Sequence, residues 1–386
     1  MLVSSKLIGQ DPDKSSRIRV MQVVDSLDAG GAETVAVNIA NSLPADRFAS
    51  YLCATRRTGP LKARLASHVP LMCLERKGRV DLNALRRMSQ YIAAQGIQVL
   101  HAHGSSLFIA QLASLGLGGR GPAIVWHDHY GRCEDDGRSR WLYRTATRGA
   151  GVIAVNTRLA KWSREKLHVP TDRVWYVPNW IEKPLFTSGS PVTLPGQPGK
   201  RIALVANFRA QKDHVTLLRA LVQVRESVPD VHLLVVGGPS EPEYAEHVHR
   251  QIRALGLEKN VEILGYRQDV NAILSECDIG VLSSVSEGLP LALLEYGGAS
   301  LPVVATDVGQ CREVLENGQA GILVSPSSPD EMARALVGLL ASPDRRAQLG
   351  AALHECVRFK HDPQVIIRQI CQIYTSLLRT ELSDSI

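Results

Sequence analysis

Short β-branched runs alternate with segments of helical periodicity along this chain, and this alternation restricts the fold more than any other feature. Residues 17–24 (RIRVMQVV) have the pattern of a strand and precede a glycine-containing loop and an apolar-periodic helix at 32–42. Strands that alternate with helices predict a parallel sheet with helices on both faces. The cycle starts again at 200–206 (KRIALVA) and continues into a predicted helix at 213–228. The pattern therefore predicts two α/β units.

A segment without periodicity separates the two units. Residues 187–200 (TSGSPVTLPGQPGK) are rich in Gly, Pro and Ser, which is typical of a linker. We predict two doubly wound domains that face each other across a cleft. In such sheets ligands bind at the carboxyl ends of the strands, so functional motifs should directly follow strands. The predicted parts are a flexible tail 1–16, an N-terminal domain 17–186, the linker 187–200, a C-terminal domain 201–362 and a C-terminal helix 363–386.

Charge is distributed unevenly between the two halves of the chain. Residues 1–190 hold 26 of the 44 Lys and Arg residues but only 15 of the 38 Asp and Glu residues, so the first half is basic. The second half holds the rest and is acidic. A basic half is compatible with nucleic acid, an anionic membrane surface or a lipid diphosphate as partner. Nucleic acid is disfavoured because no recognised nucleic-acid motif accompanies the charge.

The cysteines and the apolar runs bear on the compartment. Seven cysteines, an odd number without any CxxC pair, indicate reduced thiols and argue against a zinc ribbon. The sequence contains no run of about 18 or more uncharged apolar residues, so we expect no segment that spans a membrane. The first residues are too polar for a signal peptide. We expect a cytoplasmic protein.

The strongest candidate motif for chemistry is residues 284–295 (SVSEGLPLALLE), in which Glu287 and Glu295 flank a predicted helix start. Pro290 suits a first helical position, so Gly288 and Leu289 lie at the helix entrance with unpaired N–H groups. Such an entrance favours an anionic ligand, typically a diphosphate, and Glu295 could hydrogen-bond a ribose diol from inside the helix. For an isolated pair of this spacing, one capping and one solvated Glu is the plainer interpretation.

The wider context changes that interpretation. Residues 286–295 resemble the EX7E motif of glycosyltransferase family four, which has the GT-B fold and retains anomeric configuration. The segments 301–324, 205–218, 30–33 and 177–179 are similar to the family's other motifs, in order and with the expected spacing, over about residues 17–375. The resemblance implies two doubly wound, Rossmann-like domains, with the C-terminal helix crossing back to the first.

The resemblance also implies roles for individual residues. Arg209 and Lys212 would neutralise the leaving nucleotide diphosphate, which needs preplaced cations where no metal is used. Glu287 would contact hydroxyls of the donor sugar and Glu295 the ribose. The remaining implied donor-site residues, which offer backbone or border the nucleobase, are Gly31, Gly265, Tyr266, Gly288, Leu289 and Pro290. Gly30, His103 and His129 are acceptor-side candidates.

Two histidine pairs, His101 with His103 and His127 with His129, each follow a predicted strand. Together they could suggest a metal site. We expect none, because the family works without a divalent ion and no cysteine or spaced carboxylate completes a set. The resemblance places His127 opposite the donor sugar, where it would act on a hydroxyl or stabilise positive charge. No cofactor is expected beyond the nucleotide-diphosphate sugar, which is a substrate.

A basic, aromatic-flanked segment follows the His127 loop. Arg140, Arg144 and Arg148 recur every four residues and are predicted to share one helix face, with Arg132 and Arg138 upstream. The segment is either a solvated face or a contact with an anionic membrane or a lipid-diphosphate acceptor.

We therefore expect a retaining glycosyltransferase of the hexosyltransferase type, acting in polysaccharide or glycoconjugate synthesis. Its acceptor would be a glycan or a polyprenyl-diphosphate-linked sugar, with peripheral contact at the inner membrane face left open. Two alternatives remain: a nucleotide-sugar 2-epimerase of the same fold, and a catalytically silent partner subunit. The GxGxxG fingerprint is absent, which counts against a nicotinamide enzyme.

Overall fold

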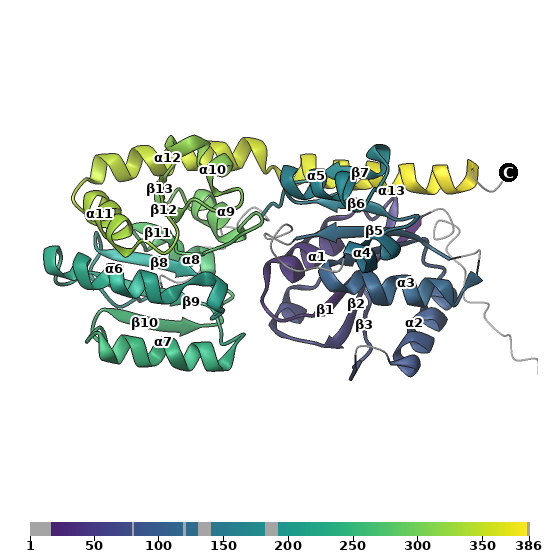
Figure 1. Cartoon of the computed structure of the whole chain (residues 1–386), viewed down its shortest axis with the longest axis horizontal. Helices are drawn as coiled ribbons and strands as arrows, with labels where there is room; N and C mark the ends of the chain where they lie inside the picture. Colours follow the sequence, from purple (N-terminus) through teal and green to yellow (C-terminus); the bar gives the residue numbers. More distant parts are fainter. Residues whose placement is uncertain (1–16, 79–80, 119–120, 130–139, 182–191, 384–386) are drawn as a thin grey trace, which may run out of the picture.

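The computed structural model describes residues 17–78, 81–118, 121–129, 140–181 and 192–383, and it consists of two parallel sheets (Figure 1). The first sheet has the strand order β3-β2-β1-β4-β5-β6-β7 and the second β10-β9-β8-β11-β12-β13. The strands of the first sheet are β1 (Ile18–Ser26), β2 (Phe48–Arg57), β3 (Leu71–Cys73), β4 (Val99–His103), β5 (Ala123–Asp128), β6 (Gly151–Ala154) and β7 (Val174–Tyr176). Those of the second are β8 (Arg201–Val205), β9 (His232–Val236), β10 (Val261–Gly265), β11 (Ile279–Leu282), β12 (Val303–Thr306) and β13 (Ile322–Val324).

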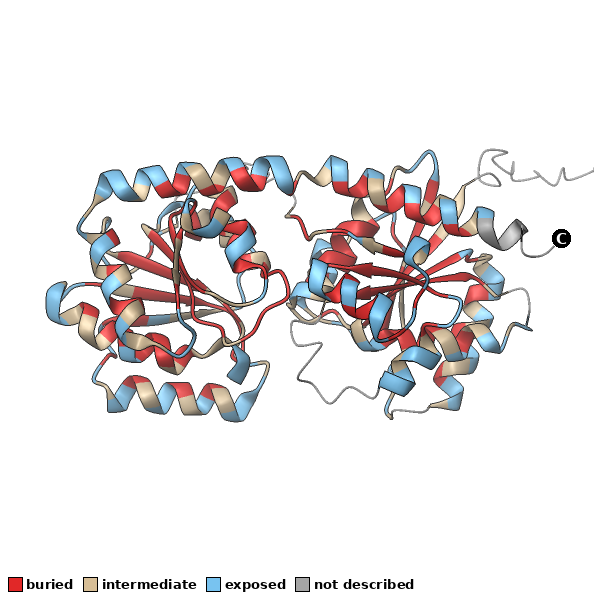
Figure 2. Cartoon of the chain, turned by 45° about the horizontal axis from the view of Figure 1, so that its top comes forward, coloured by how far each residue is buried: buried red, intermediate tan, exposed pale blue. Residues whose placement is uncertain are grey.

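Helices cover both faces of each sheet, which confirms the predicted doubly wound class. Around the first sheet they are α1 (Gly31–Ser42), α2 (Leu82–Gln95), α3 (Leu107–Leu115), α4 (Arg140–Ala146) and α5 (Thr157–Glu165). Around the second they are α6 (His214–Ser227), α7 (Pro242–Ala254), α8 (Val270–Ser275), α9 (Leu291–Gly298), α10 (Cys311–Val314), α11 (Pro329–Leu340) and α12 (Pro343–Lys360). A strand that is covered on both of its faces needs apolar side chains on both faces. Figure 2 shows that the strands are buried and that the outer faces of the helices are exposed.

The strand order reverses direction between β1 and β4 in the first sheet and between β8 and β11 in the second. At these switch points the loops that leave neighbouring strands diverge, which opens a crevice at the carboxyl ends of the strands. The loops after β1, β4, β8 and β11 are therefore the ones positioned to bind a ligand.

The last helix, α13 (Pro363–Ser383), continues from α12 and lies along the first sheet (Figure 1). Its Ile366, Ile370 and Tyr374 are buried in one apolar cluster with Val20 of β1 and Val125 of β5. The end of the chain is thus part of the core of the first sheet.

Some sequence-based details differ from the structure. Pro290 is the N-cap of α9 and not its first helical residue, and Arg148 lies beyond the end of α4, off the face predicted for it. The tail 1–16, Arg132 and Arg138 lie outside the described residues. Among the helices that the structure describes, none is long and apolar enough to cross a membrane.

Truncating the α13 contact should cost the chain much of its stability. Ile370 has no exposed surface, so Ile370→Ala leaves a cavity in the core and should lower the free energy of unfolding by about 2–5 kcal/mol. Val365→Ala on the same helix, where the side chain is 59% exposed, should change it by less than about 0.5 kcal/mol. Urea unfolding followed by circular dichroism measures both, and equal effects would contradict the packing of α13.

Candidate active site

Loops of the two sheets meet at the carboxyl ends of their strands. The amide of Asn207, after β8, donates to the carbonyl of Ala29, after β1. Asn179 Nδ2 donates to the carbonyl of Leu289 over 3.0 Å. A Cβ atom placed on Gly288 would lie only 2.8 Å from the carbonyl oxygen of His129. The loop between β11 and α9 is therefore in direct contact with the first sheet.

A buried ion pair lies at the centre of this region. Lys212 Nζ is 2.5 Å from Glu287 Oε1, and the Glu287 side chain is only 8% exposed. The same carboxylate oxygen accepts a 2.6 Å hydrogen bond from Ser284 Oγ. A buried carboxylate needs such a partner, because desolvation of an unpaired charge costs several kcal/mol. An ammonium group has three donors, and within the described residues Glu287 takes one of those of Lys212, which leaves two for a ligand.

The backbone around this pair is held in place on both sides. Lys212 ends the short 3₁₀ helix 210–212, and its carbonyl accepts from Ser283 Oγ over 2.8 Å. The Val285 N–H donates to the carbonyl of Gln211 over 2.9 Å. The loop after β8 is thus fixed against the loop after β11, on either side of the switch point.

Gly309, which follows β12, supports the Glu287 loop from beneath. It has a φ of +56°, and a Cβ atom there would lie 2.2 Å from the Glu287 carbonyl oxygen. The next residue, Gln310, donates its N–H to the Gly288 carbonyl over 3.0 Å. Only glycine fits such a close approach. Gly309 lies within the segment 301–324 that resembles a family motif, but no role was predicted for it; the available signal was a glycine three residues after the end of a strand.

Glu295 lies one helix turn beyond the N-terminus of α9 and is partly buried. Burial raises the pKa of its carboxyl group, and Arg64, from the 3₁₀ helix 60–64 beside the first sheet, opposes that shift. Glu295 therefore lies near Arg64 of the first domain, but no described contact brings it together with Glu287.

Arg209 is exposed, and within the described residues it makes no direct contact with the Lys212–Glu287 pair. Burial raises the pKa of Asp28, but Arg57, Ser26 and Arg209 outweigh it and hold the pKa below its usual value. Burial raises the pKa of Glu33, and Arg209 opposes this. Arg209 therefore faces the acidic glycine loop after β1.

Both glycines of that loop have close neighbours. A Cβ atom on Gly30 would lie 2.2 Å from the Glu33 carboxylate, which folds over it. Gly31, the first residue of α1, faces Leu291 of α9. A Cβ atom placed on Gly31 would lie 4.0 Å from Leu291 Cδ1. Gly31 thus borders the entrance of α9.

Tyr266, the first residue after β10, presents a half-exposed aromatic ring. Its ring lies directly over Gly238, where a Cβ atom would come within 2.1 Å of the ring, and the side chain is 42% exposed. Gly265 has a φ of +67°, and its carbonyl accepts from the Gly237 N–H over 2.9 Å. The half-exposed ring can stack with a planar base.

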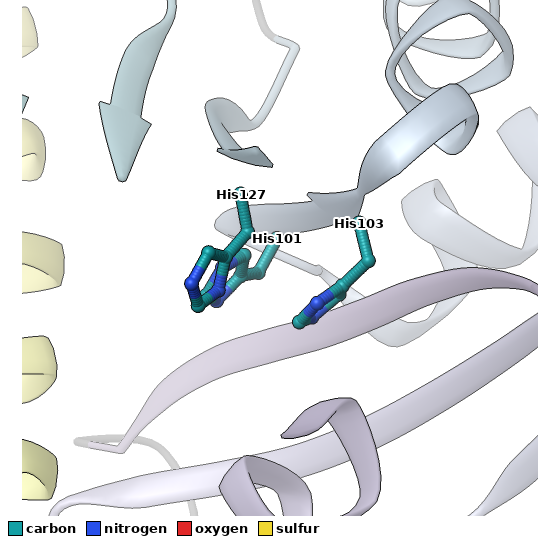
Figure 3. A group of neighbouring side chains, drawn as sticks. All are labelled: His101, His103 and His127. Atoms are coloured by element: carbon teal, nitrogen blue, oxygen red, sulfur yellow. The ribbon is translucent and has the colours of Figure 1, made fainter. Parts of the chain in front are cut away.

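Four histidines form a hydrogen-bonded ladder at the ends of β4 and β5, and Figure 3 shows three of them, His101, His103 and His127. His101 Nε2 is 3.2 Å from His127 Nδ1, and His103 Nδ1 is 3.0 Å from His129 Nε2. Their rings stack, with centroids 4.1 Å apart between His127 and His129. Burial lowers the pKa of His101 and of His129 to about 3, and those of His103 and His127 well below 6.5. All four imidazoles are therefore neutral at pH 7.

Ligand nitrogens of His101, His103 and His127 lie within 4.8 Å of one another, and imidazole binds transition metals. Five of the six ring nitrogens already hydrogen-bond to one another, to His129, to Gln22 or to Tyr374. An ion would have to displace these bonds, so a metal-free site stays our prediction.

A cavity of about 520 Å³ opens on the other side of Leu289. It is lined by Tyr176 of the first sheet, by Gln310 and Glu313 of the second, and by His361 where α12 passes into α13. Its volume is in the range of small-molecule sites, but Lys212 and Glu287 are not among its lining residues.

Two facing Rossmann-like sheets with this site between them define the GT-B fold. The crystal structure of Anabaena HepE in complex with UDP and glucose superposes with a TM-score of 0.80, covering 93% of this chain and all of HepE at 22% identity. Residues 29–183 match the model of Glycosyltransferase Family 4, and residues 199–342 match that of Glycosyl transferases group 1. The chain belongs to this family of glycosyltransferases.

Two curated relatives indicate the range of the family. The phosphatidyl-myo-inositol mannosyltransferase of Mycobacterium leprae is 32% identical over 233 residues, 59% of each chain. The chain thus spans about three fifths of that relative's length. The UDP-Gal:alpha-D-GlcNAc-diphosphoundecaprenol alpha-1,3-galactosyltransferase of Escherichia coli is 23% identical over 346 residues, 83% of this chain and 88% of the relative.

Adding one methyl group at Gly288 should disturb the contact between the sheets. In Gly288→Ala the new Cβ would press on the His129 carbonyl at 2.8 Å, so we expect a loss of stability of about 1–3 kcal/mol and weaker ligand binding. Gly338→Ala in α11 has open space around the new atom and should stabilise by about 0.5–1 kcal/mol. Urea unfolding measures both, and an unaffected Gly288→Ala would contradict the contact.

The buried histidines should make the protein sensitive to acid. Below pH 6.5 the unfolded chain binds protons that the folded His101 and His129, with pKa values of about 3, do not bind. Stability is then lost as the pH falls from 6.5, by at most about 1.4 kcal/mol per histidine and pH unit. Urea unfolding at pH 7.5 and 5.5 should show a smaller pH dependence in His129→Gln, while His68→Gln, at an exposed site, is the control. Equal pH dependence in the three proteins would contradict the ladder.

Proposed function

We propose that the protein is a retaining glycosyltransferase that moves a hexosyl group from a nucleotide-diphosphate sugar to a glycan or lipid-linked acceptor. The observation that carries this proposal is the Lys212–Glu287 pair, 2.5 Å apart, beside the entrance of α9 and beneath the His127–His129 loop. It supplies a cation and a hydrogen-bond acceptor side by side, which a sugar joined to a diphosphate requires.

The proposed chemistry follows from the charges in the cleft. As the sugar–phosphate bond breaks, negative charge develops on the departing diphosphate, and a cation fixed beforehand stabilises it without reorganisation. Lys212 and the N-terminal N–H groups of α9 take this role, with Arg209 approaching from the edge. Glu287 accepts hydrogen bonds from sugar hydroxyls, and Glu295 binds the ribose. Contact between the loops of the two sheets excludes water and limits hydrolysis.

The comparisons suggest which donors and acceptors to test first. HepE was crystallised with UDP-glucose, so a uridine nucleotide sugar is the first donor candidate. The names of the mycobacterial and E. coli relatives refer to lipid acceptors, phosphatidyl-myo-inositol and a diphosphoundecaprenol. Helix α4 exposes Trp141 (71%) and Leu142 (47%) beside Arg140 and Arg144, a combination suited to an anionic membrane surface. We propose peripheral contact there, at the cytoplasmic face.

Donor binding can be measured by thermal shift with UDP, GDP, ADP and CDP in the presence of a chelator. A ligand at a hundredfold excess over its dissociation constant stabilises the folded state by about 2.7 kcal/mol. We expect one diphosphate to raise the melting temperature of the wild type without metal and to lose this effect in Lys212→Ala. Lys200→Ala, which removes a half-exposed pair with Asp230, should respond like the wild type.

Three outcomes would contradict the proposal. The first is no shift with any diphosphate, as expected of a silent partner subunit, and the second is a shift that requires a divalent ion. The third is interconversion of a uridine-diphosphate amino sugar at C2 in the absence of acceptor, which a 2-epimerase performs and a transferase does not.

A further inference from the structure

Tyr374 of the last helix is inserted against the histidine ladder. The side chain has no exposed surface, and its ring packs edge-on against Phe48 at 6.1 Å. Its hydroxyl is 2.6 Å from His101 Nδ1 and 3.2 Å from Gln22 Nε2. A residue near the end of the chain thus reaches the ring that contacts His127.

The direction of these hydrogen bonds follows from what each group can donate. Gln22 Nε2 is an amide nitrogen, so it donates to the Tyr374 oxygen. Of the described groups bonded to this hydroxyl, only His101 Nδ1 can then accept its proton. A neutral imidazole that accepts at Nδ1 carries its proton on Nε2. His101 is therefore the Nε2–H tautomer.

The same reasoning extends to His127. His101 Nε2–H donates to His127 Nδ1 over 3.2 Å, so the proton of His127 also lies on Nε2. That atom is buried and, within the described part of the chain, has no hydrogen-bond partner. A buried donor without a partner costs free energy, and a role in binding or catalysis is one explanation for its retention.

The other arm of the ladder agrees with this direction. Gln22 Oε1 accepts from His103 Nε2 over 3.0 Å, which leaves His103 Nδ1 to accept from His129 Nε2. The Gln22 amide therefore orients both pairs of histidines. Its nitrogen acts through Tyr374 on His101 and His127, and its oxygen acts on His103 and His129.

We propose that Tyr374 is a positioning residue that holds His127 as the Nε2–H tautomer, so that His127 offers the donor sugar a hydrogen-bond donor and not a base. The tautomer follows from this chain alone, whereas its use on a sugar rests on the proposed function. Of the two roles expected for His127, this selects action on a hydroxyl, because an Nε2–H presents a donor and no lone pair to positive charge that develops on the sugar.

The test is the two-bond ¹H–¹⁵N spectrum of protein labelled with [¹⁵N]histidine, which distinguishes Nδ1–H from Nε2–H in neutral rings. His127→Gln assigns the resonance. We expect the Nε2–H pattern for His127 in the wild type and its partial conversion to Nδ1–H in Tyr374→Phe, which keeps the ring but removes the donor. Tyr91→Phe, at a half-buried tyrosine on α2 that packs on Tyr51, should leave the pattern unchanged.

An Nδ1–H pattern for His127 in the wild type overturns the proposal, whether or not the variant folds. An unchanged Nε2–H pattern in Tyr374→Phe overturns the role of Tyr374. In transfer assays Tyr374→Phe should lower kcat by about tenfold with little change in the KM for the donor, as expected for one misdirected hydrogen bond. If the wild type transfers no sugar, the proposed function is contradicted. The tautomer assignment is then still tested by the NMR spectrum, because that measurement needs no substrate.

Discussion

The candidate site depends on one buried ion pair, between Lys212 and Glu287. A carboxylate that is 8% exposed, in the loop between β11 and α9, is tolerable only because an ammonium group and the Ser284 hydroxyl compensate it. The pair also joins the loops that leave β8 and β11, the two strands at the switch point of the second sheet. The requirement to neutralise a buried charge therefore builds the site in which a cation and an acceptor lie ready for a ligand.

Glycine allows this loop to reach the first sheet. Gly309 lies against the Glu287 carbonyl and Gly288 against that of His129, at distances that exclude a side chain. Beyond His129 the histidine ladder continues to Tyr374 on α13, which packs into the first sheet. The buried charge, the glycine contacts and the last helix thus form one connected structure.

The sequence predicted the parts that depend on local pattern. Alternating strands and helices indicated two doubly wound sheets, and the spacing of Glu287 and Glu295 placed both near one helix entrance. The grouping of the two histidine pairs followed from their places after strands, but the contact of Tyr374 with His101 could not be predicted, because the two residues are 273 positions apart and no periodicity relates them. Nor could spacing show that Arg209 lies near Asp28 and Glu33, because that depends on how the two sheets meet.

The most direct test of the central claim, sugar transfer with retention in this cleft, is the anomeric configuration of a transfer product. Methanol is a suitable small acceptor, because a methyl glycoside does not mutarotate, and ¹H NMR identifies its anomer. With UDP-glucose, or whichever α-linked nucleotide sugar stabilises the protein, we expect the methyl α-glycoside, and no product with Glu287→Gln. The methyl β-glycoside as first product, or undiminished transfer by Glu287→Gln, would contradict it.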